Sequence, residues 1–462
     1  MMNFISPTNV VGLPEAEYAR LNKLVRVLLA HQAKNQQKNV YYEGRISLDQ
    51  VNLGIALPEG MSRLEIGCAW GAKCVDVLAA RSMFDGFVDA GGAELPDLDA
   101  IVANNRLIEG YAKACRDELK LGASFATLSR DPAIGCKIRF HSAQTASALW
   151  NGDKGRIDCG LAIIDSVPDN VNQTWSPSLV YFYTDNAIWV LRRFESLWSA
   201  TPYGHRMGRP LMEPLIWNAT SDKPFGRSRI KEPVRRLIDG YVRTVANASI
   251  GLEFSTAPQK YLLGVTDKQY DVLVNQKFKQ YVGSLIASTT NPETGEKPTF
   301  GQLSQGSIQP HVDMLRMLAT QFSAATGLSV TDTGVVNDAN PTSSDAILAQ
   351  SQTLVAMAEQ LNTGNGAALQ TIARMALAIT YDTRIEYLSE EQRDVIAHFK
   401  NPAMPSVAAT ADAAVKIAGV RQGFAETDVF LEMIGFDQAD IRRIRAEESR
   451  ARGDQLIAEL EL

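Results

Sequence analysis

The sequence contains few cysteines, and their arrangement is not that of a disulfide framework or a thiolate metal site. Only five of the 462 residues are cysteine, and all of them lie within the first 160 positions. No two form a Cys-x-x-Cys pair, the spacing that structural zinc sites and redox sites commonly use. Because the number is odd and no pairing is evident, we expect reduced, buried thiols in a cytoplasmic setting. They are Cys68, Cys74, Cys115, Cys136 and Cys159.

The chain also lacks an excess of positive charge and a long hydrophobic run. It has 46 Lys and Arg residues against 52 Asp and Glu residues, a formal net charge of −6. A protein that coats nucleic acid through bulk attraction needs the opposite sign, so any DNA contact must be local or weak. Asp185 interrupts the richest apolar stretch, residues 179–191, which is too short to span a bilayer. Residues 1–15 have no basic residue and no apolar core, so we expect no signal peptide, no membrane contact and a soluble intracellular protein.

Most sequence motifs of enzymes are absent as well. There is no nucleophile elbow, no glycine loop followed by Lys-Ser or Lys-Thr, and no pair among the five histidines that could share a metal. Residues 64–71, Leu-Glu-Ile-Gly-Cys-Ala-Trp-Gly, resemble the first motif of Rossmann-type methyltransferases. Ala69 replaces the middle glycine, and two predicted helices follow before any clear strand, so we interpret the stretch as a helix start that contains glycines. We predict no catalytic residue, no cofactor and no metal site.

Hydrophobic periodicity divides the chain into a mixed first half and a helical second half. Apolar residues recur at helical spacing over residues 14–37, 70–84 and 97–119. Short runs typical of strands follow at 124–128, 137–140, 156–164, 179–183 and 187–191, and Thr184-Asp185-Asn186 fits a hairpin turn. We therefore predict an α+β unit over about residues 40–220, within a chain that is predominantly helical.

The second half alternates long predicted helices with loops. We expect a basic helix at 227–249, a strand near 253–263, a helix at 267–287, a loop at 288–309 and a helix at 310–326. A further helix is predicted to begin after Asn340 as N-cap, with Pro341 in its first turn, to pause at Gly364-Asn365-Gly366 and to resume to about residue 388. The tail from residue 408 is predicted to be helical.

A concentrated group of basic residues begins this second half. Between Lys223 and Arg243 there are seven basic residues and two acidic ones, a net charge of +5 within an acidic chain. Such a segment either contacts phosphates or an acidic partner, or forms a solvated helix face whose arginines pair with acids of a neighbouring subunit. Charge runs more often serve solvation or pairing, so we favour the second interpretation on sequence alone. The basic face comprises Arg227, Arg229, Lys231, Arg235, Arg236 and Arg243.

The connector at residues 328–341 is the other segment that suggests a function. Its sequence, LSVTDTGVVNDANP, joins two predicted helices and contains no Lys or Arg. Loops of this length between helices are often functional, and the alternative is an ordinary surface loop. Its polar candidates are Asp332, Thr333, Asn337, Asp338 and Asn340.

Several short motifs occur in an order that resembles the portal proteins, or head-to-tail connectors, of long-tailed bacteriophages, particularly the branch common among phages of actinobacteria. The motifs are Tyr41-Tyr42-Glu43-Gly44, Pro224-Phe225-Gly226-Arg227-Ser228-Arg229-Ile230, Ala257-Pro258-Gln259-Lys260-Tyr261 with Gly264, Gly301-Gln302-Leu303, Phe322 to Thr326-Gly327, and Asn340-Pro341-Thr342-Ser343-Ser344-Asp345-Ala346-Ile347. The resemblance covers about residues 20–385 and is strongest over 224–350. Lys260 stands where an arginine is common and Ser329 where the family usually has proline, and the C-terminal tail does not align.

The resemblance implies the portal fold, an α+β fold with wing, stem, clip and crown that assembles into a ring, expected to be a dodecamer, around a central channel. Residues 1–226 would form the wing, 227–251 the first stem helix, 252–309 the clip and 310–327 the second stem helix. Residues 328–341 would be the tunnel loop that narrows the channel, 342–404 the tunnel helix and the return to the wing, and 405–462 the crown and C-terminal helices.

The function that the resemblance implies is structural and not enzymatic. The ring would form the channel for DNA packaging and ejection at the portal vertex of the virion capsid, after assembly in the host cytoplasm. Its partners would be copies of itself, the double-stranded DNA in the channel, the large terminase subunit, the head-tail adaptor, and the major capsid and scaffolding proteins. An acidic chain suits a conduit, because each neutralised phosphate strengthens attachment and slows sliding. The alternatives are another ring-forming minor virion or adaptor protein and, more remotely, a SAM-dependent methyltransferase.

Overall fold

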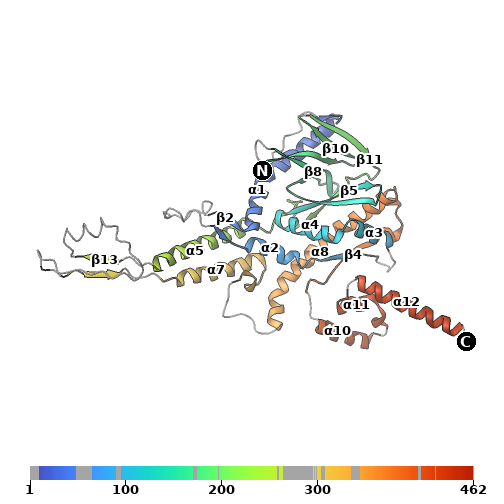
Figure 1. Cartoon of the computed structure of the whole chain (residues 1–462). Helices are drawn as coiled ribbons and strands as arrows, with labels where there is room; N and C mark the ends of the chain where they lie inside the picture. Colours follow the sequence, from blue (N-terminus) through green and yellow to red (C-terminus); the bar gives the residue numbers. More distant parts are fainter. Residues whose placement is uncertain are drawn as a thin grey trace.

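The computed structural model describes residues 10–47, 65–89, 95–169, 174–195, 197–256, 260–263, 295, 297, 299–302, 307–334, 344–403, 407–421, 423–436 and 438–460. The fold is α+β, with more residues in helices than in strands (Figure 1). The helices are α1 (Glu15–Glu43), α2 (Trp70–Ala79), α3 (Pro96–Asn104), α4 (Leu107–Leu121), α5 (Glu232–Thr256), α7 (Gln309–Thr326), α8 (Ser344–Thr380), α9 (Glu390–Arg393), α10 (Val407–Val420), α11 (Asp428–Ile434) and α12 (Gln438–Leu460).

Two sheets contain most of the strands. The larger sheet has the order β1-β11-β10-β9-β8-β7, and the smaller has the order β12-β5-β6. The pairs β15-β4, β13-β14 and β2-β3 are separate two-stranded ladders. The strands are β1 (Val10–Val11), β2 (Arg45–Ser47), β3 (Glu65–Gly67), β4 (Phe84–Asp89), β5 (Ala123–Asp131), β6 (Gly135–Ser142), β7 (Ala146–Asn151), β8 (Arg156–Asp169), β9 (Thr174–Tyr183), β10 (Ala187–Phe194), β11 (Leu197–Gly204), β12 (Met212–Ile216), β13 (Lys260–Leu263), β14 (Thr299–Gln302) and β15 (Val395–Phe399).

Helix α1 covers one face of the larger sheet. Its residues Leu21, Leu24, Val25 and Leu28 recur at helical spacing and are buried in one cluster with sheet residues such as Phe182. The helix ends at Gly44, which adopts φ 70° and whose amide donates to the carbonyl of Val40. α1 therefore joins the larger sheet, at its start, to the region of β2 and α2, at its end (Figure 1).

The larger hydrophobic core lies between the smaller sheet and helices α2, α4 and α8. The long helix α8 is buried along its second half, where Leu369, Ile372 and Ala376 have almost no exposed surface. A polar pair also lies wholly inside this core. Glu118 on α4 and Asn365 on α8 are both 0% exposed, and the amide nitrogen of Asn365 donates to Glu118 Oε2 at 2.8 Å. A buried polar group of this kind needs its partners, because water cannot replace them.

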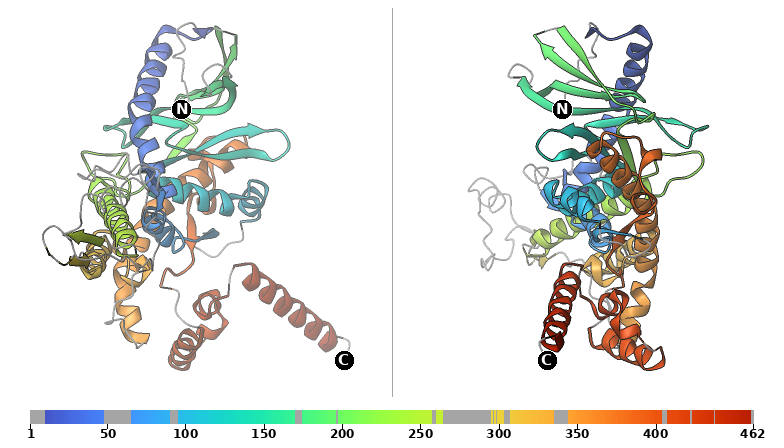
Figure 2. Two further views of the ribbon diagram at one scale, coloured as in Figure 1. Left: turned by 60° about the vertical axis from the view of Figure 1, so that its left-hand side comes forward. Right: turned by 90° about the vertical axis from the view of Figure 1, so that its right-hand side faces the viewer.

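The C-terminal helices α10, α11 and α12 lie together beside the main body (Figure 2). Electrostatic contacts between described residues join them to it. Arg442 Nη1 on α12 is 2.7 Å from Asp99 Oδ2 on α3, and His398 Nε2 on β15 is 3.8 Å from Glu432 Oε1 on α11. A neighbouring carboxylate, Asp85, raises the pKa of His398, which favours the charged form that attracts Glu432.

Most of the predicted elements are confirmed, and their ends account for most errors. The strand runs and the hairpin at residues 184–186 are present, and all five cysteines are free and buried. The helix predicted at 70–84 ends at Ala79, because β4 begins at Phe84. The helix predicted at 97–119 is divided in two at Arg106, which adopts a left-handed φ of 49°.

In the second half of the chain, several predicted helices and strands differ from the observed ones in where they end or are interrupted. Helix α8 does not pause at Gly364-Asn365-Gly366, and it ends at Thr380 and not near residue 388. The strand predicted near 253–263 is helical to Thr256 and becomes a strand only at Lys260, and the loop predicted at 288–309 contains β14. The helix predicted at 267–287 and the proposed cap at Asn340 and Pro341 lie outside the described residues.

Candidate functional site

Helices α5 and α7 form a pair that extends away from the main body, with the β13-β14 ladder at the far end (Figure 1). Residues Val234, Ile238, Val242 and Ala246 of α5 repeat every fourth position and are buried, as a helix needs in order to pack along one side. Phe322 of α7 is likewise fully buried. The two helices predicted from the sequence for this region are therefore partners.

The basic residues that begin this region do not share one helix face, which corrects the sequence prediction. Helix α5 begins at Glu232 and not at residue 227, so Arg227, Arg229 and Lys231 precede it. Arg229 is only 7% exposed, and it cannot belong to a solvated or DNA-facing surface. Arg227, Lys231, Arg236 and Arg243 are exposed, and Arg235 is half-buried.

Arg229 instead holds three helices together. Its Nε donates to the carbonyl oxygen of Cys74 on α2, and its Nη2 donates to the carbonyl oxygen of Thr326 on α7 at 2.6 Å. Nη1 lies 3.3 Å from the sulfur of Met357 on α8, and the guanidinium lies 5.8 Å from the ring of Trp217. Burial lowers the pKa of Arg229. The planar group thus satisfies the carbonyl of Thr326 at the end of α7, directly before the connector, while it also bonds to α2.

The described part of the connector, residues 328–334, is fixed to this cluster. The indole nitrogen of Trp70 donates to the carbonyl oxygen of Thr333 at 3.0 Å, and the Trp70 ring lies 4.7 Å from that of Phe322. Asp332 accepts from both the amide and the hydroxyl of Ser329, at 3.0 and 2.8 Å. These bonds stabilise the short 3-10 turn η3 (Thr331–Thr333).

The predicted connector residues are thus placed only in part. Asp332 and Thr333 are half-buried, and the Asp332 carboxylate serves a turn as well as carrying a charge. Asn337, Asp338 and Asn340 lie outside the described residues. Ser329, which stands where the resembling family usually has proline, supplies the hydroxyl for this turn.

Arg235 and Arg236 are adjacent in sequence but have different surroundings. The Arg235 guanidinium lies 5.9 Å from the ring of Tyr41, whose hydroxyl donates to Asp239 Oδ1 at 2.7 Å. Burial and this hydrogen bond raise the pKa of Tyr41 to about 12. Arg236 forms an exposed ion pair with Glu232 at 3.3 Å. Arg235 therefore binds the end of α1 to α5, and Arg236 remains on the surface.

Sequence reasoning missed Trp70 and the structural role of Arg229. A signal for the second was present, because Pro233 fits the first turn of a helix and would break a helix that began at residue 227. Placing the helix start at Glu232 would have separated Arg229 from the exposed face. No local pattern links Trp70 with Thr333, since they are 263 positions apart.

In the described part of the glycine motif, residues 65–71, Gly71 serves packing. Strand β3 pairs antiparallel with β2, and α2 begins at Trp70, which is 3% exposed. A Cβ atom on Gly71 would lie 1.9 Å from the carbonyl oxygen of Tyr41, so only glycine lets α2 approach the end of α1 this closely. Backbone of α1 therefore occupies the space next to Gly71.

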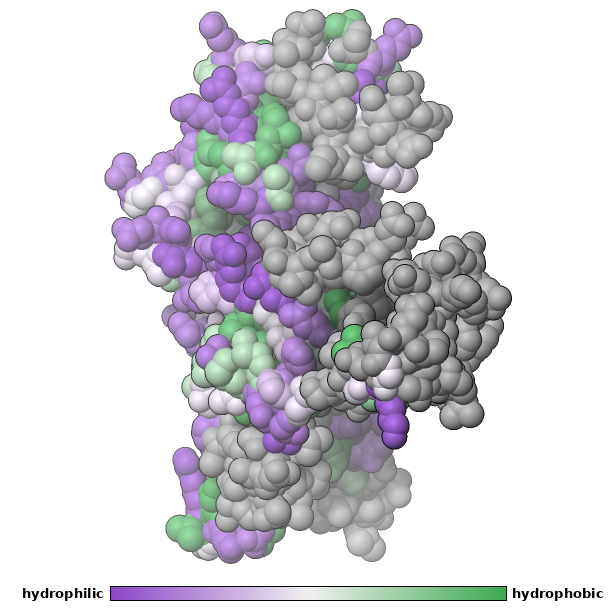
Figure 3. Space-filling view, turned by 90° about the vertical axis from the view of Figure 1, so that its left-hand side faces the viewer, coloured by the Kyte–Doolittle hydropathy of each residue, from purple (hydrophilic) through white to green (hydrophobic). Residues whose placement is uncertain are grey.

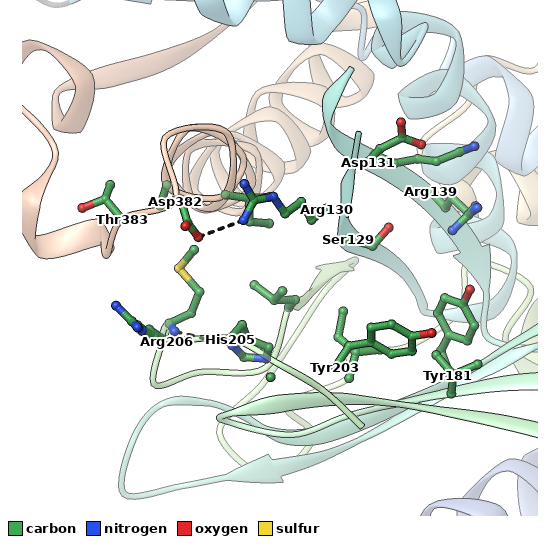
Figure 4. Close-up of a pocket in the computed structure, with 18 of the residues that line it drawn as sticks. Ser129, Arg130, Asp131, Arg139, Tyr181, Tyr203, His205, Arg206, Asp382 and Thr383 are labelled. Carbon is green, nitrogen blue, oxygen red and sulfur yellow. Dashed lines mark hydrogen bonds and ion pairs between the residues drawn. The ribbon is translucent and has the colours of Figure 1, made fainter. Parts of the chain in front are cut away.

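A cavity of about 520 Å³ lies between the two sheets and the end of α8 (Figure 4). Arg130 on β5 and Arg139 on β6 line it with Tyr181 of the larger sheet. Arg130 forms an ion pair with Asp382 at 3.1 Å, which Figure 4 marks with a dashed line. Part of the positive charge in this cavity is thus balanced by an acid from the same chain.

The described residues contain neither a cluster of metal ligands nor a helix that could span a membrane. No three His, Cys, Asp or Glu side chains in the described part of the chain gather as a metal site requires. None of the helices that the structure describes is both long and apolar enough to cross a bilayer.

Comparison with known proteins gives consistent matches over most of the chain. A family model described as phage portal protein, SPP1 Gp6-like, matches residues 88–454. A portal protein of Mycobacterium phage D29 is 25% identical over 445 residues, covering 92% of this chain and 88% of the relative. A portal protein of Mycobacterium phage L5 is 25% identical over 387 residues, covering 80% and 76%. A solved chain from the neck of a native GTA particle, computed with C12 symmetry, covers 88% of this chain and 99% of its own length at 12% identity and a TM-score of 0.47.

Proposed function

The chain belongs to the phage portal proteins of the SPP1 Gp6-like family and has a phage portal function, and we propose that it performs this function as a closed ring around a central DNA channel. The observation that carries the proposal is the family match over residues 88–454, which includes the helix pair, the connector and the C-terminal helices. A chain whose two contact faces differ forms a ring when the rotation between neighbours closes after a whole number of copies, without a rise along the axis. A dodecamer is the expected form.

We propose the following division of the chain. Residues 1–226 form the wing, α5 and α7 the stem, 252–309 the clip, 328–341 the tunnel loop, 342–404 the tunnel helix and return to the wing, and 405–462 the crown. The projection of α5 and α7 from the body, with β13-β14 at their far end, supports the assignment of stem and clip. The hydrogen bond from Trp70 to η3 holds the first residues of the proposed tunnel loop against α2, which supports a loop with a rigid base.

Portal proteins are structural, and we propose that this chain has no enzymatic step of its own. A separate large terminase subunit would supply the energy for DNA movement, and a head-tail adaptor would replace it later. Major capsid and scaffolding proteins would surround the ring, which would be assembled in the host cytoplasm and remain at the portal vertex of the virion. The packing role of Gly71 disfavours the methyltransferase alternative.

We propose that the exposed stem arginines, Arg236 and Arg243, contact the neighbouring subunit. They are seven positions apart and so lie on one face of α5, and each subunit of an acidic chain offers carboxylates to the next. A channel lining that faces DNA is the other assignment for these residues. Strong salt-dependent DNA binding by the isolated ring, lost in R236Q/R243Q, would favour that second assignment.

The ring is tested by the mass and image of the purified protein. We expect a particle of about 600 kDa by mass photometry, since the chain is 50.5 kDa and the proposed ring has about twelve copies. Negative-stain microscopy should show a central hole. A ring of a different subunit number would instead support another ring-forming minor virion or adaptor protein.

The tunnel loop is tested by reversing its charge. In D332K/D338K we expect packaged DNA to fall by about tenfold or more, because lysines in the narrowest passage would bind phosphates and slow sliding. Ring assembly should be unchanged by mass photometry. D332N/D338N is the matched control, since asparagine keeps an oxygen that can accept from Ser329, and it should package DNA nearly normally. Normal packaging by the lysine variant would show that the loop assignment is wrong.

A further inference from the structure

A groove of about 830 Å³ lies at the base of the projecting helix pair, and several of the basic residues described above line it. One wall is the C-terminal half of α1, and the other is the segment 223–235 that leads into α5. The bond from Tyr41 to Asp239 fixes these walls relative to each other. Figure 1 shows the end of α1 beside the start of α5, where the pair leaves the body.

Six cations line this groove, and cations outnumber carboxylates in its lining by six to one. They are Lys34, Lys38, Lys223, Arg227, Lys231 and Arg235. Glu232 is the single carboxylate in the lining, and it is already paired with Arg236 at 3.3 Å. Within the described part of the chain, none of the six forms an ion pair with a carboxylate. Burial, together with the charges of Arg235 and Lys34, lowers the pKa of Lys38 to about 8. The positive charges of Lys38, Arg235 and Lys34 repel one another, and a bound anion would relieve this repulsion.

The floor of the groove is apolar. This floor distinguishes two possible anionic partners, duplex DNA and an acidic peptide. Leu28, Leu121, Phe125 and Phe225 are among the residues that line it. Duplex DNA presents its phosphates on the outside of a stiff helix, so it would meet the charged rim and leave this floor uncovered. An acidic peptide segment can pair its carboxylates with the rim and insert an apolar side chain below.

We propose that this groove binds an acidic segment of another protein, one that also carries an apolar anchor side chain and packs around the base of the projecting helix pair. The position supports this occupant, because a protein that surrounds the pair must pass over the groove. Figure 3 shows the face from which the pair projects, where hydrophilic side chains predominate and hydrophobic ones gather in small patches between them. The inference stands on the groove and does not depend on ring formation.

The test uses a fluorescent acidic peptide with apolar anchors, of sequence EDLEFDED, and the full-length protein. We expect saturable binding by fluorescence polarisation that weakens as salt is raised. In K34E/K231E, both of which change exposed residues, binding should weaken by about tenfold or more. K113E makes the same kind of charge change on the exposed surface of α4 and should bind like the unaltered protein. The peptide EDSESDED, without anchors, should bind more weakly.

Each other outcome overturns the proposal. Absence of saturable binding, or equal binding by K34E/K231E, would show that the groove is not the site. Equal binding of both peptides would remove the role of the apolar floor. A short DNA duplex that binds in place of the peptide, with the same loss in K34E/K231E, would assign the groove to nucleic acid. Binding by the single chain that disappears in the assembled ring would assign it to a neighbouring copy. Mass photometry reports on the ring separately, so the two proposals can fail independently.

Discussion

Replacing Arg229 with alanine should lower the free energy of unfolding by about 3 kcal/mol, measured by chemical denaturation of the purified protein. The substitution removes the donor to the carbonyl oxygen of Thr326 and a second donor to that of Cys74. A buried acceptor without its donor costs about 1–3 kcal/mol, and the Thr326 carbonyl at the end of α7 bears that loss, whereas the Cys74 carbonyl lies inside α2 and keeps its helical donor. The space left beneath Trp217 and beside Met357 adds a packing cost.

The expected effect is also local, because Thr326 is the last residue of α7. Its carbonyl is one of the four at a helix end that lack a partner within the helix. Without Arg229, the end of α7 and the turn at residues 328–334 should exchange amide hydrogens faster than the core around α8. Hydrogen exchange followed by mass spectrometry would show whether the loss of stability is concentrated there. It should be, if Arg229 holds the end of α7 against α2.

Two variants distinguish the hydrogen bonds of Arg229 from its positive charge as the source of the stability. R229K keeps a cation but replaces the planar fork with a single nitrogen, which cannot copy donation from both Nε and Nη2, so it should recover little of the lost stability. R227A removes an exposed arginine two positions earlier and should change stability by less than about 0.5 kcal/mol. An R229A protein as stable as R227A would show that the buried hydrogen bonds of Arg229 do not stabilise the fold.

The role of Arg229 also shows where sequence reasoning succeeds and fails. A run of charges predicts an exposed face only if every member lies on one element, and Pro233 shows that the helix begins after Arg229. The amphipathic spacing of α1 and α7 was sufficient to predict those helices, because burial of one side follows directly from it. Contacts such as Trp70 with Thr333 join distant segments, and no local pattern specifies them.

The continuity of α8 is a second example. Gly364 and Gly366 are poor helix formers, costing about 1 kcal/mol each relative to alanine, so the sequence favours a break. The structure overrides that preference because Leu361 and Leu369 on either side are buried in the same core. Asn365 between the glycines is itself anchored, since it donates to Glu118 Oε2 and to the hydroxyl of Tyr111 at 3.0 Å.

Replacing Glu118, the buried partner of Asn365, with glutamine should increase the stability of the protein. Glu118 Oε1 and Asn365 Oδ1 are both buried without a donor among the described residues. Burial raises the pKa of Glu118 to about 8, and the hydrogen bond from Asn365 lowers it only in part. Protonation turns Glu118 Oε1 into a hydroxyl donor and removes the buried charge, whereas the ionised form leaves both oxygens as acceptors without a donor.

The pH dependence follows from the direction of this shift. The pKa in the folded chain, about 8, is above the ordinary value of 4.5 that applies to the unfolded chain. The folded state therefore holds the proton more tightly, and the stability contributed by Glu118 is complete below pH 4.5 and is lost as pH rises toward 8. Over pH 5 to 8 the loss attributable to this residue should be about 3 kcal/mol.

E118Q should remove that dependence, because its amide is neutral at every pH and offers both a donor and an acceptor to Asn365. Relative to the unaltered protein we expect little change at pH 5 and a gain of about 2–3 kcal/mol at pH 8, measured by denaturation at a series of pH values. Subtracting the two curves cancels other titrating groups, such as His141, whose pKa burial lowers to about 4. E109Q, an exposed change on the same helix, should give a flat difference. A flat difference for E118Q as well would mean that Glu118 is ionised inside the fold, and the two oxygens would then need another donor.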